Sequence, residues 1–200
     1  PIRRSLTEKC SRNEALARFG LDPALKTLLV MGGSQGAHGI NAAMSHAAGE
    51  LGTKRIQIIH LTGKEDRDAV RSAYASAGLR AYVEAFCDRM EAAYSAADLC
   101  IARSGAASLT EISHFALPSI LIPFPFAADD HQTSNANIFE SAGAAELLPQ
   151  KDVAGDVLAR KVLSLLDSPA RLEVLSSRCA QLAPGPAAER IAEVLLRHCL

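Results

Sequence analysis

Residues 99–112, LCIARSGAASLTEI, join a short apolar run to a segment with helical periodicity. The run Leu99–Ala102 predicts a buried strand, and the spacing of Leu109 and Ile112 predicts a helix directly after it. The small residues between them therefore lie at a strand-to-helix turn. There the first helical N–H groups have no partner within the helix and carry partial positive charge. Turns of this kind are suited to binding anions.

Glu111 gives this helix a second chemical feature. It lies about two turns into the helix, on or near the face that carries Ser104 and Ala107. A carboxylate there can accept two hydrogen bonds from a vicinal diol such as that of a ribose. This favours a nucleotide held at the start of the helix with its sugar on Glu111. The alternative is an ordinary helix with Ser104 as its N-cap and a solvated Glu111.

The alternation of strand and helix extends along the whole chain. Such alternation predicts an α/β fold with a parallel sheet covered on both faces. We therefore expect residues 1–200 to form a single Rossmann-like, doubly wound domain. Strands are predicted at 27–31, 55–61, 80–86, 99–102, 119–122 and 144–148, and helices at 8–19, 40–48, 65–77, 88–96, after residue 102, at 131–141 and from 152 onward, the last broken at 168–169 and 184–186.

Composition and charge exclude several classes of protein. The 200 residues suit one domain, and the net charge of −1 without any basic run argues against nucleic acid as a partner. The five cysteines are scattered and lack CxxC spacing, which suits free thiols in a reducing compartment. No apolar run reaches the length of about 18 residues that a membrane span needs.

A glycine-rich turn, Gly32-Gly33-Ser34-Gln35-Gly36-Ala37, follows the first predicted strand. Its glycines allow backbone N–H groups to approach phosphate oxygens, and Ser34 adds a hydroxyl donor. The turn lacks the Gly-Lys-Ser/Thr ending of a Walker A motif and is not a clean GxGxxG motif. A dehydrogenase is also disfavoured, because residues 53–57 lack the acidic side chain expected about 20 positions further on. A turn without a ligand is the alternative.

Two further loops fall at the same expected edge of the sheet. Phe86-Cys87 closes a strand, where the backbone could pair with a base edge, although such a Phe is more often part of a core. His131 and Gln132 can both donate and accept hydrogen bonds to sugar hydroxyls. A metal site at 129–131 is the alternative, but no second His or Cys lies nearby at ligand spacing and the aspartates can cap a helix. No catalytic nucleophile is evident.

Three segments in this order, 32–37, 103–111 and 130–136, resemble the C-terminal half of the MurG-type N-acetylglucosaminyltransferases of bacterial peptidoglycan synthesis. The resemblance covers nearly the whole chain. It implies the donor-binding half of an inverting GT-B glycosyltransferase that takes UDP-GlcNAc as substrate and needs no metal and no cofactor. The catalytic base is then expected in an N-terminal domain that this chain lacks, so no catalytic residue is assigned here.

The resemblance also implies what the absent domain does. That domain would bind the lipid-linked acceptor, undecaprenyl-diphospho-N-acetylmuramoyl-pentapeptide. It would also attach the enzyme peripherally to the cytoplasmic side of the bacterial inner membrane. We therefore expect this chain to bind donor without turnover. We expect its last helix, from about residue 186 to 199, to pack toward the absent domain.

Site residues are carried over from the resemblance position by position. Glu111 would bind the ribose, and the backbone of Cys87 would face the uracil beside Phe86 and Met90. One departure is His38, where the family commonly has Arg. The remaining positions are Gly33, Ser34, Gln35 and Gly36 with Arg3 nearby for the diphosphate, Arg103, Ser104, Gly105, Ala106, Ala107 and Ser108 for the second loop around the nucleotide, and His131 and Gln132 for the GlcNAc hydroxyls.

Two alternative functions remain open at this point. The chain could be the donor domain of another GT-B UDP-sugar transferase or of a UDP-sugar epimerase. An epimerase needs acid and base groups in the sugar pocket, and His131 is the one candidate for such a role. The chain could instead be a non-catalytic, nucleotide-binding scaffold domain, which nucleotide-independent partner binding would favour.

Overall fold

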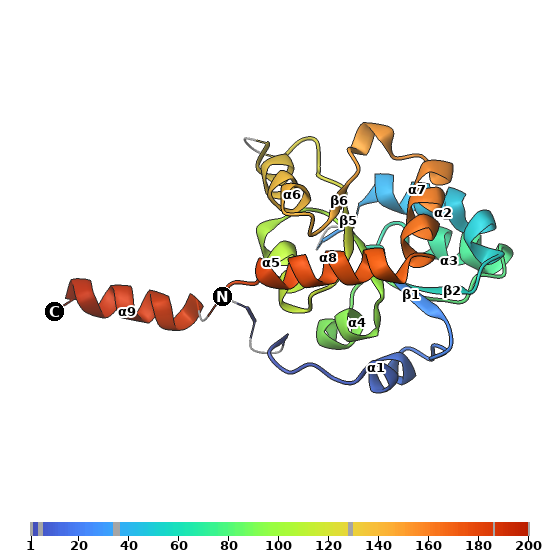
Figure 1. The fold of residues 1–200 in the computed structure, drawn as a ribbon. Coiled ribbons are helices and arrows are strands. Elements are labelled where there is room, and N and C mark those ends of the chain that lie inside the picture. The colour runs from blue at the N-terminus through green and yellow to red at the C-terminus, as the bar shows by residue number, and fades with distance from the viewer. Residues whose placement is uncertain (1, 4–5, 34–36, 128–129, 186, 200) are drawn as a thin grey trace.

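The computed structural model describes residues 2–3, 6–33, 37–127, 130–185 and 187–199, and within them six strands form one parallel sheet (Figure 1). The order across the sheet is β3-β2-β1-β4-β5-β6, which reverses between β1 and β4 as in doubly wound Rossmann folds. The predicted fold class is confirmed. The strands are β1 (Lys26–Met31), β2 (Ile56–Leu61), β3 (Ala81–Glu84), β4 (Leu99–Ala102), β5 (Ser119–Leu121) and β6 (Glu146–Leu147).

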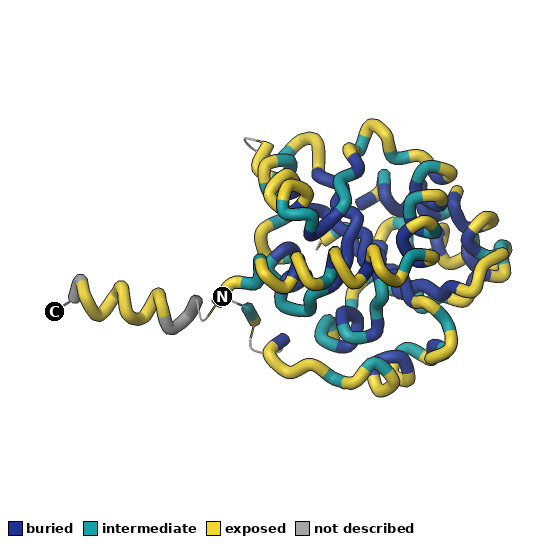
Figure 2. Tube along the Cα trace, in the orientation of Figure 1, coloured by how far each residue is buried: buried dark blue, intermediate teal, exposed yellow. Residues whose placement is uncertain are grey.

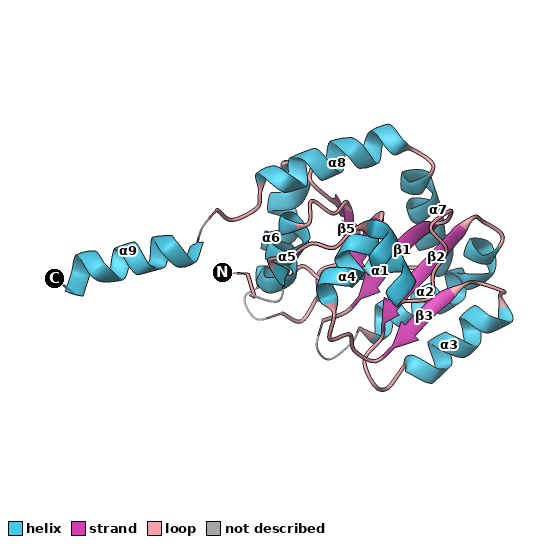
Figure 3. Cartoon of the chain, turned by 90° about the horizontal axis from the view of Figure 1, so that it is seen from below, coloured by secondary structure: helices cyan, strands magenta, loops and turns pink. Residues whose placement is uncertain are grey.

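Helices cover both faces of this sheet (Figure 3). The helices α2 and α7 pack together on one face, and α1 and α4 pack together on the other. The helices are α1 (Arg12–Arg18), α2 (His38–Gly52), α3 (Arg67–Ser76), α4 (Met90–Ala96), α5 (Ala106–His114), α6 (His131–Ser141), α7 (Gly155–Leu166), α8 (Pro169–Gln181) and α9 (Ala187–Cys199), with the short 3-10 helix η3 (Gln150–Asp152) before α7.

Two hydrophobic cores, one on each side of the sheet, follow from the side-chain alternation of the strands. In β1, Leu28 and Val30 belong to the core that holds α2, α3 and α7. Leu29 and Met31 belong to the core that holds α1, α4 and α5. The central strands are buried on both faces, as Figure 2 shows, which explains why apolar residues predominate in them and why polar members such as Thr27 and His60 are buried as well.

Most differences from the predicted elements lie at their ends. The first helix begins at Arg12 because Ser11 and Glu14 form a capping box, with Ser11 N donating to Glu14 Oε2 at 3.0 Å. The third strand ends at Glu84 and the last strand is two residues long. The predicted breaks near Ser168-Pro169 and after Pro184 are confirmed, since α7, α8 and α9 are separate helices.

Helix α9 extends away from the rest of the chain, whereas α8 lies across the body of the domain (Figure 1). The apolar side chains Ile191, Val194 and Leu195 of α9 are 50%, 55% and 58% exposed. None of the helices in the described part of the chain combines the length and apolarity needed to cross a membrane.

Candidate functional site

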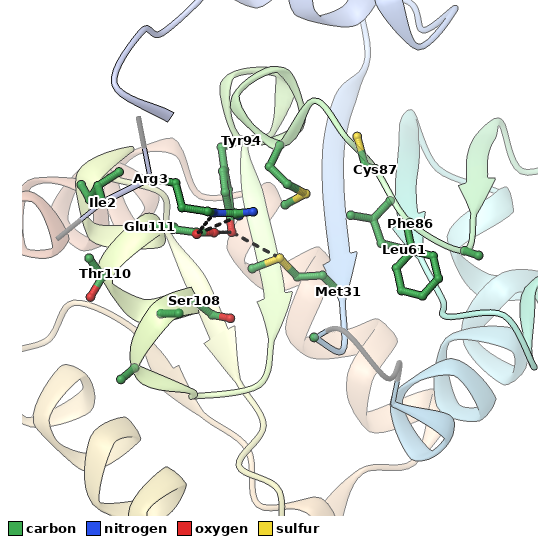
Figure 4. Close-up of a pocket in the computed structure, with 15 residues that line it drawn as sticks. Ile2, Arg3, Met31, Leu61, Phe86, Cys87, Tyr94, Ser108, Thr110 and Glu111 are labelled. Atoms are coloured by element: carbon green, nitrogen blue, oxygen red, sulfur yellow. Dashed lines mark hydrogen bonds and ion pairs between the residues drawn. The ribbon is translucent and has the colours of Figure 1, made fainter. Parts of the chain in front are cut away.

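A cavity of about 720 Å³ opens at the carboxyl ends of the strands, beside the point where the strand order reverses (Figure 4). Open α/β sheets bind ligands at this position because the loops on either side of the reversal diverge. The cavity draws on the N-terminal segment, β1, β2, the β3–α4 connection, α4 and α5. Its lining residues are Ile2, Arg3, Met31, Gly33, Leu61, Ala85, Phe86, Cys87, Met90, Tyr94, Ala106, Ala107, Ser108, Thr110 and Glu111.

Glu111 is the buried acid of this cavity. It is 8% exposed, and Arg3 and Tyr94 bind its two carboxylate oxygens. Arg3 donates to Oε1 from Nε at 3.1 Å and from Nη2 at 2.9 Å. Tyr94 donates its hydroxyl hydrogen to Oε2 at 2.8 Å. The alternative in which Glu111 is a solvated helix residue is therefore wrong.

Tyr94, on α4, is a residue of this site that sequence analysis missed. It is 3% exposed, its ring stacks on Phe115 with centroids 5.0 Å apart, and its hydroxyl oxygen also lies 3.6 Å from Met31 Sδ. Burial, and then the charge of Glu111, raise the pKa of Tyr94 far above its ordinary value. No motif marks this position, because a Tyr within an apolar helical pattern is indistinguishable from a core residue.

The start of α5 forms one wall of the cavity. Gly105 is its N-cap, and no side chain caps the helix. Ala106 and Ala107 are exposed and, with Ser108, line the cavity, so a ligand can approach the uncapped N–H groups. Ser104 is not the N-cap, because its Oγ donates to the backbone oxygen of Gln132 at 2.8 Å.

The β3–α4 connection forms an apolar wall opposite. Phe86 is 48% exposed and lines the cavity, so it is not the core residue that its type most often indicates. Cys87 and Met90 lie beside it on the same wall. Cys87 lies outside the strands and helices, and burial raises the pKa of its thiol. A planar base could lie against this wall.

The glycine-rich turn meets the cavity at Gly33. Its φ of +87° is a left-handed conformation that favours glycine, and it turns the chain away from the end of β1. Ser34, Gln35 and Gly36, predicted to bind the diphosphate, lie outside the described residues.

The structure places Arg103 away from the expected position around the nucleotide. Its Nη1 donates to the carbonyl oxygens of Ile122 and Pro123, both at 3.0 Å, and its guanidinium lies 5.4 Å from the centre of the Phe124 ring. Burial lowers the pKa of Arg103 to about 10, so it remains protonated near neutral pH. Arg103 therefore supports the segment after β5, and its side chain does not line the cavity.

His131 and Gln132 also lie outside the cavity lining, at the start of α6. Gln132 Oε1 accepts a hydrogen bond from Phe124 N at 3.0 Å, which ties α6 to the segment after β5. Their assignment to GlcNAc hydroxyls stays a prediction. Asp129 lies outside the described residues, and among those described no group of three or more His, Cys, Asp or Glu is placed to hold a metal ion.

Fold and cavity together define a doubly wound α/β domain with a candidate ligand site where its strand order reverses, and comparison with known proteins identifies the family. Residues 27–191 match the model of the glycosyltransferase family 28 C-terminal domain. Because this match covers most of the chain, the chain belongs to that family.

The individual relatives agree with this assignment. A UDP-N-acetylglucosamine–N-acetylmuramyl-(pentapeptide) pyrophosphoryl-undecaprenol N-acetylglucosamine transferase of Anaeromyxobacter dehalogenans is 41% identical over 198 residues, which are 98% of this chain and 50% of that protein. The crystal structure of Acinetobacter baumannii MurG superposes with a TM-score of 0.79 at 30% identity, over 86% of this chain and 52% of that one. The chain thus spans about half the length of the relatives it matches.

A more distant structure shows how widely the fold is shared. A putative UDP-N-acetylglucosamine 2-epimerase from Listeria monocytogenes superposes with a TM-score of 0.70 at 15% identity, over 96% of this chain and 49% of that one. At this identity the likeness concerns the fold alone. The choice among enzyme classes must therefore come from the site and from the nearer relatives.

Proposed function

We propose that this chain is the UDP-GlcNAc-binding half of an inverting glycosyltransferase that makes the disaccharide lipid precursor of peptidoglycan. The acceptor would be undecaprenyl-diphospho-N-acetylmuramoyl-pentapeptide. Support comes from the family, from the activity for which the nearer relatives are named and from the cavity at the carboxyl edge of the sheet.

One observation carries the proposal: the buried Glu111 carboxylate and the uncapped start of α5 line the same cavity. A nucleoside diphosphate needs both an acceptor for its ribose hydroxyls and donors for its phosphates. The apolar wall at Phe86 and Met90 adds a surface for the base. A binding site for a sugar without a nucleotide would not need this combination.

The proposed chemistry requires stabilisation of the departing UDP. Negative charge grows on the diphosphate as the bond to the sugar breaks. N–H groups at the starts of α2 and α5 carry partial positive charge that would favour this change. Arg3 supplies a full positive charge close by, since its guanidinium is at the cavity through its contact with Glu111.

Transfer also needs a base that takes the proton from the acceptor hydroxyl. We place that base in an N-terminal domain of the relatives that this chain does not cover. The same domain would bind the lipid-linked acceptor and associate with the inner membrane, and the exposed apolar face of α9 would pack against it. The chain by itself would bind donor without transferring sugar, and measured transfer by the chain alone would contradict this part.

Calorimetric titration with UDP-GlcNAc, UDP-GalNAc and UDP tests donor binding. The proposal predicts saturable binding of UDP and UDP-GlcNAc, with weaker binding of UDP-GalNAc. Glu111→Ala should lower the affinity for UDP by about tenfold or more, the cost of losing hydrogen bonds to a charged group. Glu173→Ala is the matched control, because Glu173 is an exposed acid on α8 outside this cavity.

The outcomes separate the alternatives. Equal affinity for the two sugar nucleotides would favour another donor specificity or an epimerase. Failure to bind UDP at millimolar concentration would contradict donor binding by this chain. Binding of a protein partner that does not depend on nucleotide would then favour the scaffold alternative.

A further inference from the structure

The two oxygens of the Glu111 carboxylate accept hydrogen bonds from two different residues, one buried and one exposed. Oε2 accepts from the buried Tyr94 hydroxyl, and Oε1 accepts from Arg3, whose side chain is 62% exposed. The Tyr94 contact is therefore internal to the domain, whereas the Arg3 contact is open to solvent, and both meet at the Glu111 carboxylate (Figure 4). A ligand could displace Arg3 from Oε1 without disturbing the domain core.

The direction of the Tyr94 hydrogen bond is fixed by chemistry. An ionised carboxylate can only accept, so Tyr94 must donate its single hydroxyl hydrogen to Oε2. Burial and the adjacent negative charge raise the pKa of Tyr94, so the hydroxyl keeps its hydrogen at any ordinary pH. The Tyr94 hydroxyl is therefore always able to donate this hydrogen bond to Glu111.

The Tyr94 ring holds the hydroxyl in place. It stacks on Phe115 at an interplanar angle of 29°, and α4, which carries it, packs against α1 and β1. The carboxylate of Glu111 comes from a different element, α5, and a free Glu side chain has several rotamers. A hydrogen bond between a fixed ring on α4 and a carboxylate on α5 restricts those rotamers.

From this arrangement we propose that Tyr94 is a positioning residue, which fixes the Glu111 carboxylate so that its remaining acceptor sites face the ribose hydroxyls of the bound nucleotide. The inference rests on the proposed function. Its consequence is selectivity for ribose: Tyr94 acts through Glu111, and it sets how well the site distinguishes a 2′,3′-diol from a sugar without one.

The test compares UDP with 2′,3′-dideoxyuridine diphosphate on the 200-residue chain by calorimetry. The unaltered chain should prefer UDP by about tenfold or more. Tyr94→Phe keeps the ring and its stacking, and it should reduce this preference by about fivefold while leaving the affinity for the dideoxy analogue nearly unchanged. Tyr82→Phe is the matched control, because Tyr82 packs edge-on against Phe19 and does not line the cavity.

A merely structural role for Tyr94 would give a different result. Damage to the cavity would weaken both nucleotides equally, so an unchanged UDP preference in Tyr94→Phe overturns the inference. In the Glu111→Ala background, Tyr94→Phe should change the preference no further, and an additional loss there would also overturn it. If the unaltered chain binds UDP and 2′,3′-dideoxyuridine diphosphate equally well, the chain is a nucleotide-binding domain, but the roles given to Glu111 and Tyr94 are wrong. If it does not bind UDP at all, the proposed function itself fails.

Discussion

Arg3 Nε and Nη2 both donate to the same oxygen of Glu111, at 3.1 and 2.9 Å, although the two residues are 108 positions apart in the chain. The guanidinium thus covers Oε1, one of the two oxygens predicted to accept from a ribose. The place near the diphosphate that the family resemblance implies for Arg3 stays a prediction. Because the Arg3 side chain is 62% exposed, solvent screens the pair and it is weak.

Removing Arg3 should therefore help a nucleoside that lacks phosphate. Arg3→Ala frees Oε1 for a ribose hydroxyl. We therefore expect uridine to bind up to about fivefold more tightly than to the unaltered chain, a small gain because the exposed Arg3–Glu111 ion pair that uridine no longer has to displace is weak. Calorimetric or NMR titration with uridine checks this, with Arg80→Ala as the control because Arg80 is an exposed Arg outside the cavity. Weaker uridine binding in Arg3→Ala would mean that Arg3 assists nucleoside binding and does not compete with it.

Arg103 should affect stability and not ribose selectivity. Arg103→Met removes the donors to Ile122 O and Pro123 O and leaves two buried carbonyls with one partner fewer. We expect the free energy of unfolding to fall by about 1–3 kcal/mol. Urea denaturation measures this, and the ratio of UDP to dideoxy-UDP affinity should stay the same. Normal stability with a lost preference for UDP would restore the expected role of Arg103 at the ligand.

Two glycines of α2 provide an internal test of the packing. A Cβ on Gly52 would lie 2.3 Å from the backbone oxygen of Ala77, whereas one on Gly49 would meet nothing within 4 Å. Gly52→Ala should therefore destabilise the chain by about 1–3 kcal/mol. Gly49→Ala should stabilise it by about 0.5–1 kcal/mol through helix propensity. Equal effects in thermal or urea unfolding would contradict the close approach at Gly52.

The buried His60 should make stability depend on pH. Its ring nitrogens bind Tyr74 Oη at 2.8 Å and Asn41 Oδ1 at 2.9 Å, and burial lowers its pKa from 6.5 to about 3. Between these two values the unfolded chain binds a proton that the folded chain does not. This contribution to stability is thus intact above pH 6.5 and is lost progressively as the pH falls toward 3.

Urea denaturation between pH 6 and pH 4 measures the effect. One such proton makes the free energy of unfolding fall by about 1.4 kcal/mol for each pH unit. His60→Asn should lessen the slope by up to this amount, whereas His46→Gln, at an exposed position, should leave it unchanged. A slope that is the same in His60→Asn and in the unaltered chain would contradict a neutral, buried His60.

The fold could be predicted from the sequence because the same hydrophobic pattern recurs in each strand-and-helix unit of the chain. Each apolar run followed by a small-residue turn and an apolar-periodic segment predicts one strand and one helix, and β4 with α5 is such a unit. Glu111 could be placed at the cavity because its position depends only on helix periodicity from that turn.

Side-chain partners from other elements could not be predicted in this way. Arg103 follows directly after β4, but its direction depends on the carbonyls at the end of β5. Tyr94 and Arg3 reach Glu111 through the packing of α4 and the path of the N-terminal segment, which periodicity does not encode. The sequence thus predicts which edge of the sheet carries the site and leaves its hydrogen bonds to the structure.

A crystal structure of the chain with bound UDP would decide whether this cavity is the donor site. We predict UDP in the cavity at the carboxyl ends of the strands, with its ribose hydroxyls on Glu111, its base against the Phe86 wall, Arg3 displaced from Oε1, and Tyr94 still donating to Oε2. UDP bound elsewhere, or UDP in this cavity with the Arg3–Glu111 pair intact and the ribose away from Glu111, would contradict it.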